Sequence, residues 1–239
     1  MAQSSGILFL LFASVILPIT LAIIWIKRWN NSKPVFLGAA TFLIFQVLTR
    51  LPLLQVVLPR FAWFHIFAAT QPVLYLFLLS FSAGIFEEIG RSIVMRKFMK
   101  DSPFSWSIGF GIGHGGIEAV LLIGTGVIIQ LFQAGGAISG TPPSMLFLGG
   151  LERLFAISAH IGLSVMVWES IKSRRSVLLL LAILLHGLFN FSAVYLLQQG
   201  FSLYVVEGLL GLFAAGFLIY VVLRWQTNAR GNNHASEKR

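Results

Sequence analysis

The chain has 239 residues, of which 57% are hydrophobic and only 10% are charged, and its mean hydropathy is +0.87. A soluble globular domain contains about 25% charged residues, so this composition indicates a surface that faces lipid. The apolar runs are long and continuous, as spanning helices require, whereas a transmembrane barrel would show alternating segments of about ten residues. We therefore expect an all-α, polytopic membrane helix bundle.

The net charge of +9 and the absence of cysteine narrow the possible functions. Without cysteine the chain forms no disulfide, no thiolate zinc site and no thiol nucleophile. Cationic loops that face an anionic cytoplasmic leaflet explain the positive charge better than nucleic-acid binding does. The lipid bilayer is therefore an expected partner, and nucleic acid is not.

Seven apolar segments are long enough to span a bilayer as helices, and we take eight as the upper limit. The first segment lacks the basic start and the small-residue cleavage site of a secretory signal. No soluble part is long enough to fold alone, so we expect residues 1–239 to form a single membrane domain with a tail at about 225–239. The expected spans are 6–26, 35–58, 66–92, 104–133, 145–171, 176–197 and 203–224.

Lysine and arginine gather in alternate loops. Thirteen of the 17 basic residues follow the first, third, fifth and seventh spans, whereas the loop near 59–65 has only Arg60. Basic loops stay preferentially in the cytoplasm, so this pattern predicts an N-terminus outside and a C-terminus and tail in the cytoplasm.

Ionisable residues also lie inside the expected spans, where each charge costs about 2.5–3.5 kcal/mol at the bilayer centre and is a candidate for function. Residues three, four or seven apart lie on nearly the same face of a helix. Four spans therefore each present a polar group, and we expect these groups to face one cavity. The groups are Glu87 and Glu88 with Arg91, His114 with Glu118, Glu152 and Arg153 with His160, and His186 with Asn190.

These residue types predict hydrolysis by an activated water. A glutamate and a histidine from different helices can share a water, which one of them deprotonates while the other orients it. A histidine and an asparagine on one helix face can donate hydrogen bonds to the developing oxyanion. The same residues can hold zinc, with His114, His160 and His186 as the alternative ligand set, although no HExxH sequence occurs.

Two other classes of protein use similar residues. Buried glutamates and histidines relay protons in transporters, but the sequence has no inverted repeat and no matched broken helices. A non-catalytic membrane protein, such as an immunity protein that binds a peptide, is a further alternative. Arg91 can form a structural ion pair, and the glycines from Gly109 to Gly116 can serve helix packing alone.

Three motifs resemble those of the CAAX-protease and bacteriocin-processing (CPBP) superfamily. FEEIGR (86–91), FGIGH (110–114) and HGLFN (186–190) are similar to its EExxxR, FxxxH and HxxxN motifs. GHGGIE and LERLFAISAH resemble more closely its YhfC-like bacterial branch of glutamic-type intramembrane endopeptidases. The resemblance covers about 81–195, the expected catalytic core. One residue fewer than in the motif separates Glu88 from Arg91, which moves the arginine by about 100° around the helix.

The resemblance implies an intramembrane peptidase, a hydrolase that needs no cofactor, with zinc as the alternative. It implies a multi-pass protein of a bacterial plasma membrane that cleaves a membrane-associated peptide or protein. It assigns Glu87 as the base, His114 as its partner, and His186 with Asn190 as the oxyanion site. We expect the other polar residues to support them: Glu88, Arg91, Glu118, Glu152, Arg153 and His160.

Overall fold

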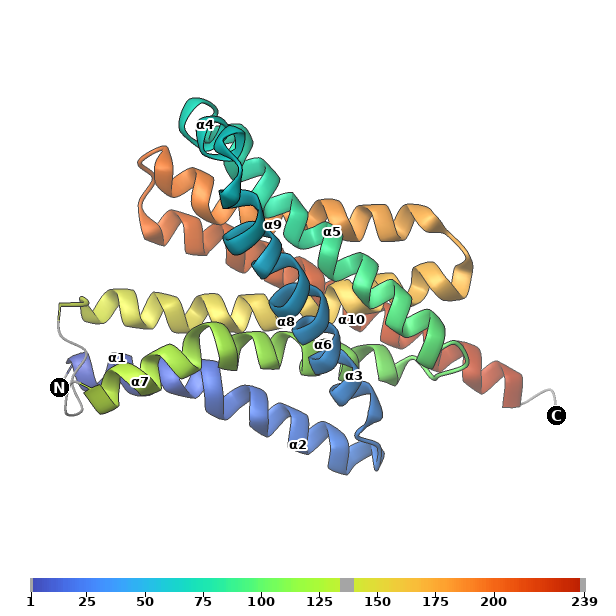
Figure 1. The fold of residues 1–239 in the computed structure, drawn as a ribbon. Coiled ribbons are helices and arrows are strands. Elements are labelled where there is room, and N and C mark those ends of the chain that lie inside the picture. Colours follow the sequence, from blue (N-terminus) through green and yellow to red (C-terminus); the bar gives the residue numbers. More distant parts are fainter. Residues whose placement is uncertain (1, 134–139, 237–239) are drawn as a thin grey trace.

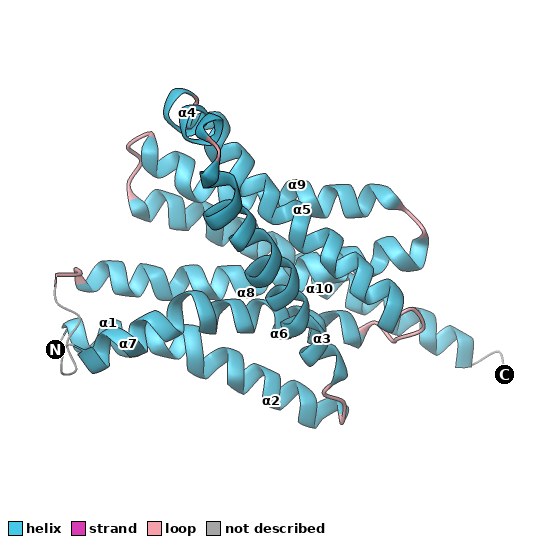
Figure 2. Cartoon of the chain, in the orientation of Figure 1, coloured by secondary structure: helices cyan, strands magenta, loops and turns pink. Residues whose placement is uncertain are grey.

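The computed structural model describes residues 2–133 and 140–236. Within these ranges the regular structure is helical throughout and contains no strand (Figure 2), which confirms the all-α prediction. Among the described residues, seven helices are long and apolar enough to cross a membrane, and each overlaps one of the expected spans. They are Gln3–Trp29, Lys33–Arg60, Pro72–Phe98, Ser105–Gln133, Pro143–Ser173, Ser176–Gln198 and Leu203–Arg230.

Three spans consist of α-helical pieces joined by short π-helical segments, which often occur at functional sites. The first span contains α1 (Ala2–Leu11), η1 (Phe12–Ile16) and α2 (Leu17–Trp29). The second contains α3 (Lys33–Phe42), η2 (Leu43–Arg50), η3 (Leu53–Val57) and the 3-10 turn η4 (Leu58–Arg60). The fourth contains α6 (Ser105–Glu118), η5 (Ala119–Gly124) and α7 (Thr125–Gln133).

The remaining helices are uninterrupted. They are α4 (Ala62–Thr70), α5 (Pro72–Phe98), α8 (Pro143–Ser173), α9 (Ser176–Gln198) and α10 (Leu203–Ser236). The third span was expected to begin at residue 66, but α4 is separate and α5 begins at Pro72. Proline is suited to the first turn of a helix and disfavours helical geometry in the residue before it. Gln71 accordingly has φ −130° and ψ 59°, and the chain turns there.

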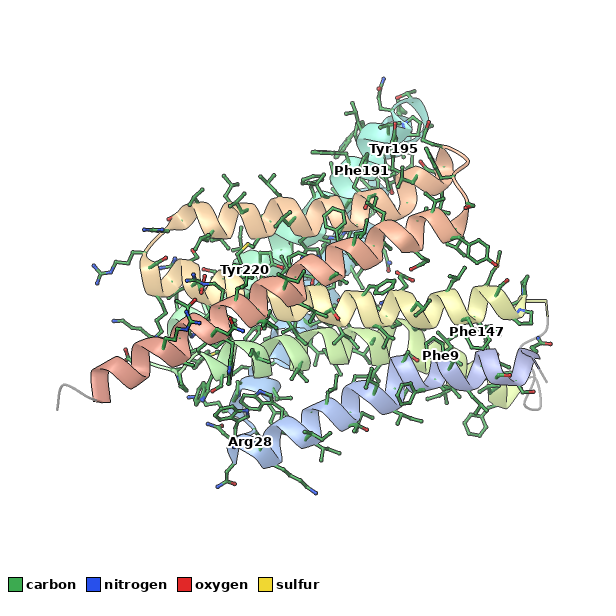
Figure 3. The ribbon with its side chains drawn as sticks, turned by 180° about the vertical axis from the view of Figure 1, so that it is seen from behind. Phe9, Arg28, Phe147, Phe191, Tyr195 and Tyr220 are labelled. Atoms are coloured by element: carbon green, nitrogen blue, oxygen red, sulfur yellow. The ribbon has the colours of Figure 1, made fainter. Side chains whose placement is uncertain are left out.

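The long helix α8 forms the centre of the bundle. In its apolar window 72% of the residues are buried, against 22–39% in the other spans. It packs against α1, α6, α9 and α10. Phe9 of α1 stacks on Phe147 of α8, with ring centroids 5.6 Å apart, and Tyr220 of α10 donates a hydrogen bond to Glu169 of α8 (2.7 Å). Figure 3 labels Phe9, Phe147 and Tyr220.

The two ends of the described chain lie at opposite ends of the bundle, as an odd number of spans requires (Figure 1). Large apolar side chains such as Leu48, Ile66, Leu180 and Leu212 are exposed on its outer surface, where lipid would cover them. Which end faces the cytoplasm stays a prediction from the loop charges.

Glycines on α6 allow three helices to meet around His114. A Cβ atom at Gly113 would overlap the carbonyl oxygen of Val35 on α3, and one at Gly111 would lie 2.5 Å from Cα of Ile161 on α8. A Cβ atom at Gly38 of α3 would in turn overlap the carbonyl oxygen of Phe110. Small residues permit such close backbone contact in membranes. The glycine run thus positions α6 between α3 and α8.

Replacing Gly113 should therefore destabilise the bundle. We expect Gly113→Ala to lower the free energy of unfolding by about 1–3 kcal/mol, because the added methyl group meets backbone that has to shift. Thermal unfolding in detergent measures the effect. The control is Gly208→Ala on α10, where an added Cβ atom meets nothing within 4 Å. Equal unfolding temperatures for the two variants would contradict the packing described here.

Candidate active site

A cavity of about 450 Å³ lies among five of the spans, in the size range of pockets that bind small ligands. Part of its wall is apolar and comes from residues such as Leu76, Leu122 and Val194. The cavity contains members of all four polar groups expected from the sequence. Its polar lining consists of Gln46, Arg50, Ser80, Glu87, Glu118, Glu152, Arg153, His160, His186 and Asn190.

Glu87 of α5 lines the cavity, and His114 of α6 lies behind it. Oε2 of Glu87 is 2.9 Å from Nε2 of His114, and the side chain of His114 is fully buried outside the cavity lining. Of the two adjacent glutamates, Glu87 is therefore the one that contacts His114. This contact fixes the orientation of a carboxylate that faces the cavity.

Glu88 lies behind the cavity and orients a second histidine. Its Oε1 atom accepts a hydrogen bond from Nδ1 of His186 on α9 (2.8 Å). Because the Nδ1 proton of His186 is used in this bond, its Nε2 atom is the one directed toward Glu87, 4.0 Å from Oε2. Arg91 lies 3.5 Å from the other oxygen of Glu88. Glu88 is thus a buried carboxylate between a cation and an imidazole.

Arg91 connects α5 to α8. Its terminal nitrogens donate to the carbonyl oxygen of His160 (3.2 Å) and to Nδ1 of the same residue (3.1 Å). Arginine is a donor only, so Nδ1 of His160 must accept and Nε2 carries the ring proton. Nε2 of His160 lies 2.6 Å from Oε2 of Glu118, to which it donates. His160, which lines the cavity, is therefore also held in place by hydrogen bonds from a residue behind the lining, Arg91.

A further group of charges extends this network along α8. Arg153 contacts Glu118 (3.5 Å) and Glu152 (2.5 Å). Glu207 of α10, which has no polar partner nearby in sequence, is buried within electrostatic range of Glu152 and Arg153. Its Oε2 atom has no hydrogen-bond partner among the described residues. Glu207 does not line the cavity, whereas Glu152 and Arg153 do.

Two lining residues, Gln46 and Arg50, were not among the expected site residues. They lie four apart on the π-helical segment η2, and both are buried. The available signal was the presence of an arginine and a glutamine at helical spacing within an apolar span. Without a motif to accompany it, that pair could not be assigned to the site.

Four side chains of the site form a group that can bind a metal ion. One ligand atom each from Glu87, His114, Glu118 and His160 lies within 4.8 Å of the others. The group shares His114 and His160 with the expected zinc set, but it contains two carboxylates and does not include His186. Imidazole nitrogen and carboxylate oxygen are ligands that zinc accepts.

The fold and the site together define a class of membrane protein in which buried carboxylates and imidazoles face a cavity between transmembrane helices. Residues 13–139 and 134–210 match the family model described as YhfC intramembrane metalloprotease. The chain is also 36% identical over 260 residues to the uncharacterized membrane protein YhfC of Bacillus subtilis (strain 168), covering 93% of this chain and 97% of that protein. No solved structure gives a significant match.

The chain belongs to the YhfC family of membrane proteins, whose family model describes an intramembrane protease. The expectations of a YhfC-family, multi-pass bacterial membrane protein and of an intramembrane protease in general are thereby confirmed. Membership in the wider CPBP superfamily and the glutamic mechanism stay predictions, as do the individual roles of the site residues.

Proposed function

We propose that the protein is an intramembrane endopeptidase of the glutamic type, which hydrolyses a peptide bond of a membrane-associated substrate. The observation that carries the proposal is the pair formed by Glu87 and His186 in the cavity. Oε2 of Glu87 and Nε2 of His186 are 4.0 Å apart, and each side chain is fixed from behind by a buried partner. A water molecule can bridge polar groups at that separation.

In this proposal Glu87 is the general base. Its carboxylate takes a proton from the bridging water, and the resulting nucleophile attacks the carbonyl carbon of the peptide. His114 does not touch the cavity, so it acts as a positioning residue that holds Glu87 through the 2.9 Å contact. A positioned base of this kind contributes about 10²–10⁴-fold to the rate.

His186 and Asn190 stabilise the oxyanion that develops on the carbonyl oxygen. They lie four apart on α9, both line the cavity, and hydrogen bonds aimed at developing charge are effective in a water-poor site. Because Nδ1 of His186 is bound to Glu88, the ring donates to the oxyanion from Nε2 in its imidazolium form. The same Nε2 proton can pass to the leaving amine, which releases the products. The proton that Glu87 took from the water then returns to Nε2 of His186 and restores both residues.

A metal-dependent endopeptidase is the second candidate. It is favoured by the four donors within 4.8 Å and by the description of the family. Glu87, His114, Glu118 and His160 would hold the ion, and a bound zinc would supply Lewis acidity toward the substrate carbonyl. The donor types and their spacing are compatible with such a site.

The hydrogen bonds at the Nδ1 atoms of the site histidines favour the glutamic mechanism over the metal-dependent one. A histidine that binds a metal usually donates its other N–H to a carboxylate or a carbonyl. Nδ1 of His160 instead accepts from Arg91, which leaves the proton on the Nε2 atom that would have to bind the metal. Among the described residues, Nδ1 of His114 has no hydrogen-bond partner, and of the three site histidines only His186 donates from Nδ1 to a carboxylate.

Replacement of Glu87 tests the proposed activity. We expect Glu87→Gln to reduce cleavage by about 10²–10⁴-fold, because the amide cannot accept the proton of the water. Mass spectrometry of membrane peptides compares cells that produce the wild type with cells that produce the variant. Asp101→Asn, which alters an exposed carboxylate in the loop between α5 and α6, is the control. Identical cleavage products with Glu87→Gln would contradict the proposal.

The metal content of the purified protein separates the two candidates. The glutamic form predicts less than about 0.1 zinc per chain after purification without chelator, because His160 presents a protonated Nε2 atom to the site. Elemental analysis by mass spectrometry measures this content without any substrate. The opposite result is about one zinc per chain that is lost in His114→Ala and in His160→Ala, and it would establish the metal-dependent candidate.

A further inference from the structure

Arg50 is a buried cation in the wall of the active-site cavity. The residue is only 7% exposed, and its three hydrogen-bond partners among the described residues are neutral: Oγ of Ser82 (3.0 Å), Oε1 of Gln46 (3.1 Å) and the carbonyl oxygen of Leu79 (2.5 Å). Among the described residues no carboxylate lies within 4.0 Å of it. Arg91 and Arg153, the two other arginines buried in the described part of the chain, each have at least one carboxylate within that distance.

An unpaired guanidinium is an unfavourable group to bury in a membrane protein. Its charge is removed from water without an opposite charge in contact, which costs several kcal/mol. Arginine has five N–H groups, and the three contacts of Arg50 leave one of them on each terminal nitrogen. Two parallel N–H groups match the two oxygens of a carboxylate. The side chain therefore has both the charge and the free donors to bind one.

The position of Arg50 relates it to the catalytic glutamate. It ends the π-helical segment η2 and is attached to α5 at Leu79 and Ser82. These residues precede Glu87 by eight and five positions, which is about 7–12 Å along the helix. Arg50 and Glu87 line the same cavity. An extended peptide covers this distance in about two to four residues.

We propose that Arg50 binds a carboxylate of the substrate, about two to four residues from the bond that is cleaved. This inference rests on the proposed endopeptidase function and adds a specificity to it. The apolar lining at Leu76, Leu122 and Val194 would hold the apolar side chains between. The carboxylate can belong to an Asp or Glu side chain or to the C-terminus of the peptide, since both offer the same two oxygens.

Three photoreactive peptides test the carboxylate site without requiring cleavage. Each is a short apolar peptide with a photoreactive leucine, and the three end in a free carboxylate, in an amide, or in an amide with one internal aspartate. Cross-linking to the reconstituted full chain carrying Glu87→Gln, which prevents turnover, gives their apparent affinities. We expect one or both of the acidic peptides to bind at least about tenfold more tightly than the neutral amide.

Substitution of Arg50 should remove this preference. We expect Arg50→Gln to bind all three peptides alike, Arg50→Lys to keep part of the preference, and Arg50→Glu to favour a peptide with an internal lysine. Arg60→Gln, an exposed arginine at the end of the same span, is the control and should leave the preference intact. Thermal unfolding checks that the variants fold. If Arg50→Gln does not fold, the test is whether Arg50→Lys keeps part of the preference for acidic peptides.

Equal binding of the acidic and neutral peptides to the chain that retains Arg50 would overturn the proposal. So would a preference that persists in Arg50→Gln, which would mean that Arg50 only ties the second span to α5. The free-acid and aspartate peptides distinguish the two sources of the carboxylate. A preference for acidic peptides without cleavage by the wild type would contradict the peptidase function alone, and cleavage without a preference would contradict the carboxylate site alone.

Discussion

The organisation of the site depends on the ion pair between Arg91 and Glu88. Both side chains are fully buried in a bundle whose outer surface faces lipid, so neither charge is solvated by water. Removal of one partner from such a pair typically costs about 3–5 kcal/mol, because the other charge stays buried alone. Arg91 also donates two hydrogen bonds to His160. One guanidinium thus joins α5 to α8 and, through Glu88 and His186, to α9.

This arrangement gives two adjacent glutamates different environments. Successive residues of a helix point about 100° apart, so Glu87 and Glu88 point in different directions, although His186 lies near both carboxylates. Glu87 faces the cavity and contacts His114, whereas Glu88 is directed away from it, toward Arg91 and His186. A cavity-facing carboxylate and an oriented imidazole result from one pair of neighbouring residues. The buried residues behind the cavity therefore fix the orientation of the carboxylate and the imidazole that line it.

Much of this organisation could be predicted from the sequence, because apolar length and helical spacing reflect it directly. All seven spans were expected, and the polar groups of four helices do meet around one cavity. Spacing shows which residues share a helix face, but not how neighbouring helices are rotated. The sequence allowed Arg91 to pair with either glutamate, and the structure pairs it with Glu88. Its unusual position in the motif is compatible with the contacts to His160.

Other features left no clear pattern in the sequence. The break at Gln71 and the π-helical segments depend on local backbone geometry that apolar periodicity does not record. Arg50 reaches the cavity from a span without a recognised motif, through contacts with residues about 30 positions away. Tertiary hydrogen bonds also decide the tautomers of the histidines, and these tautomers bear most directly on whether a metal or a glutamate activates water.

Nitrogen-15 NMR of the histidine side chains in the reconstituted protein tests the central claim, that the buried layer fixes the rings for glutamate-driven hydrolysis. Signals are assigned with His160→Asn and His186→Asn variants. We expect Nδ1 of His186 to carry a proton and Nδ1 of His160 to carry none, since the first donates to Glu88 and the second accepts from Arg91. A proton on Nδ1 of His160 together with a bare Nδ1 of His186 would contradict it.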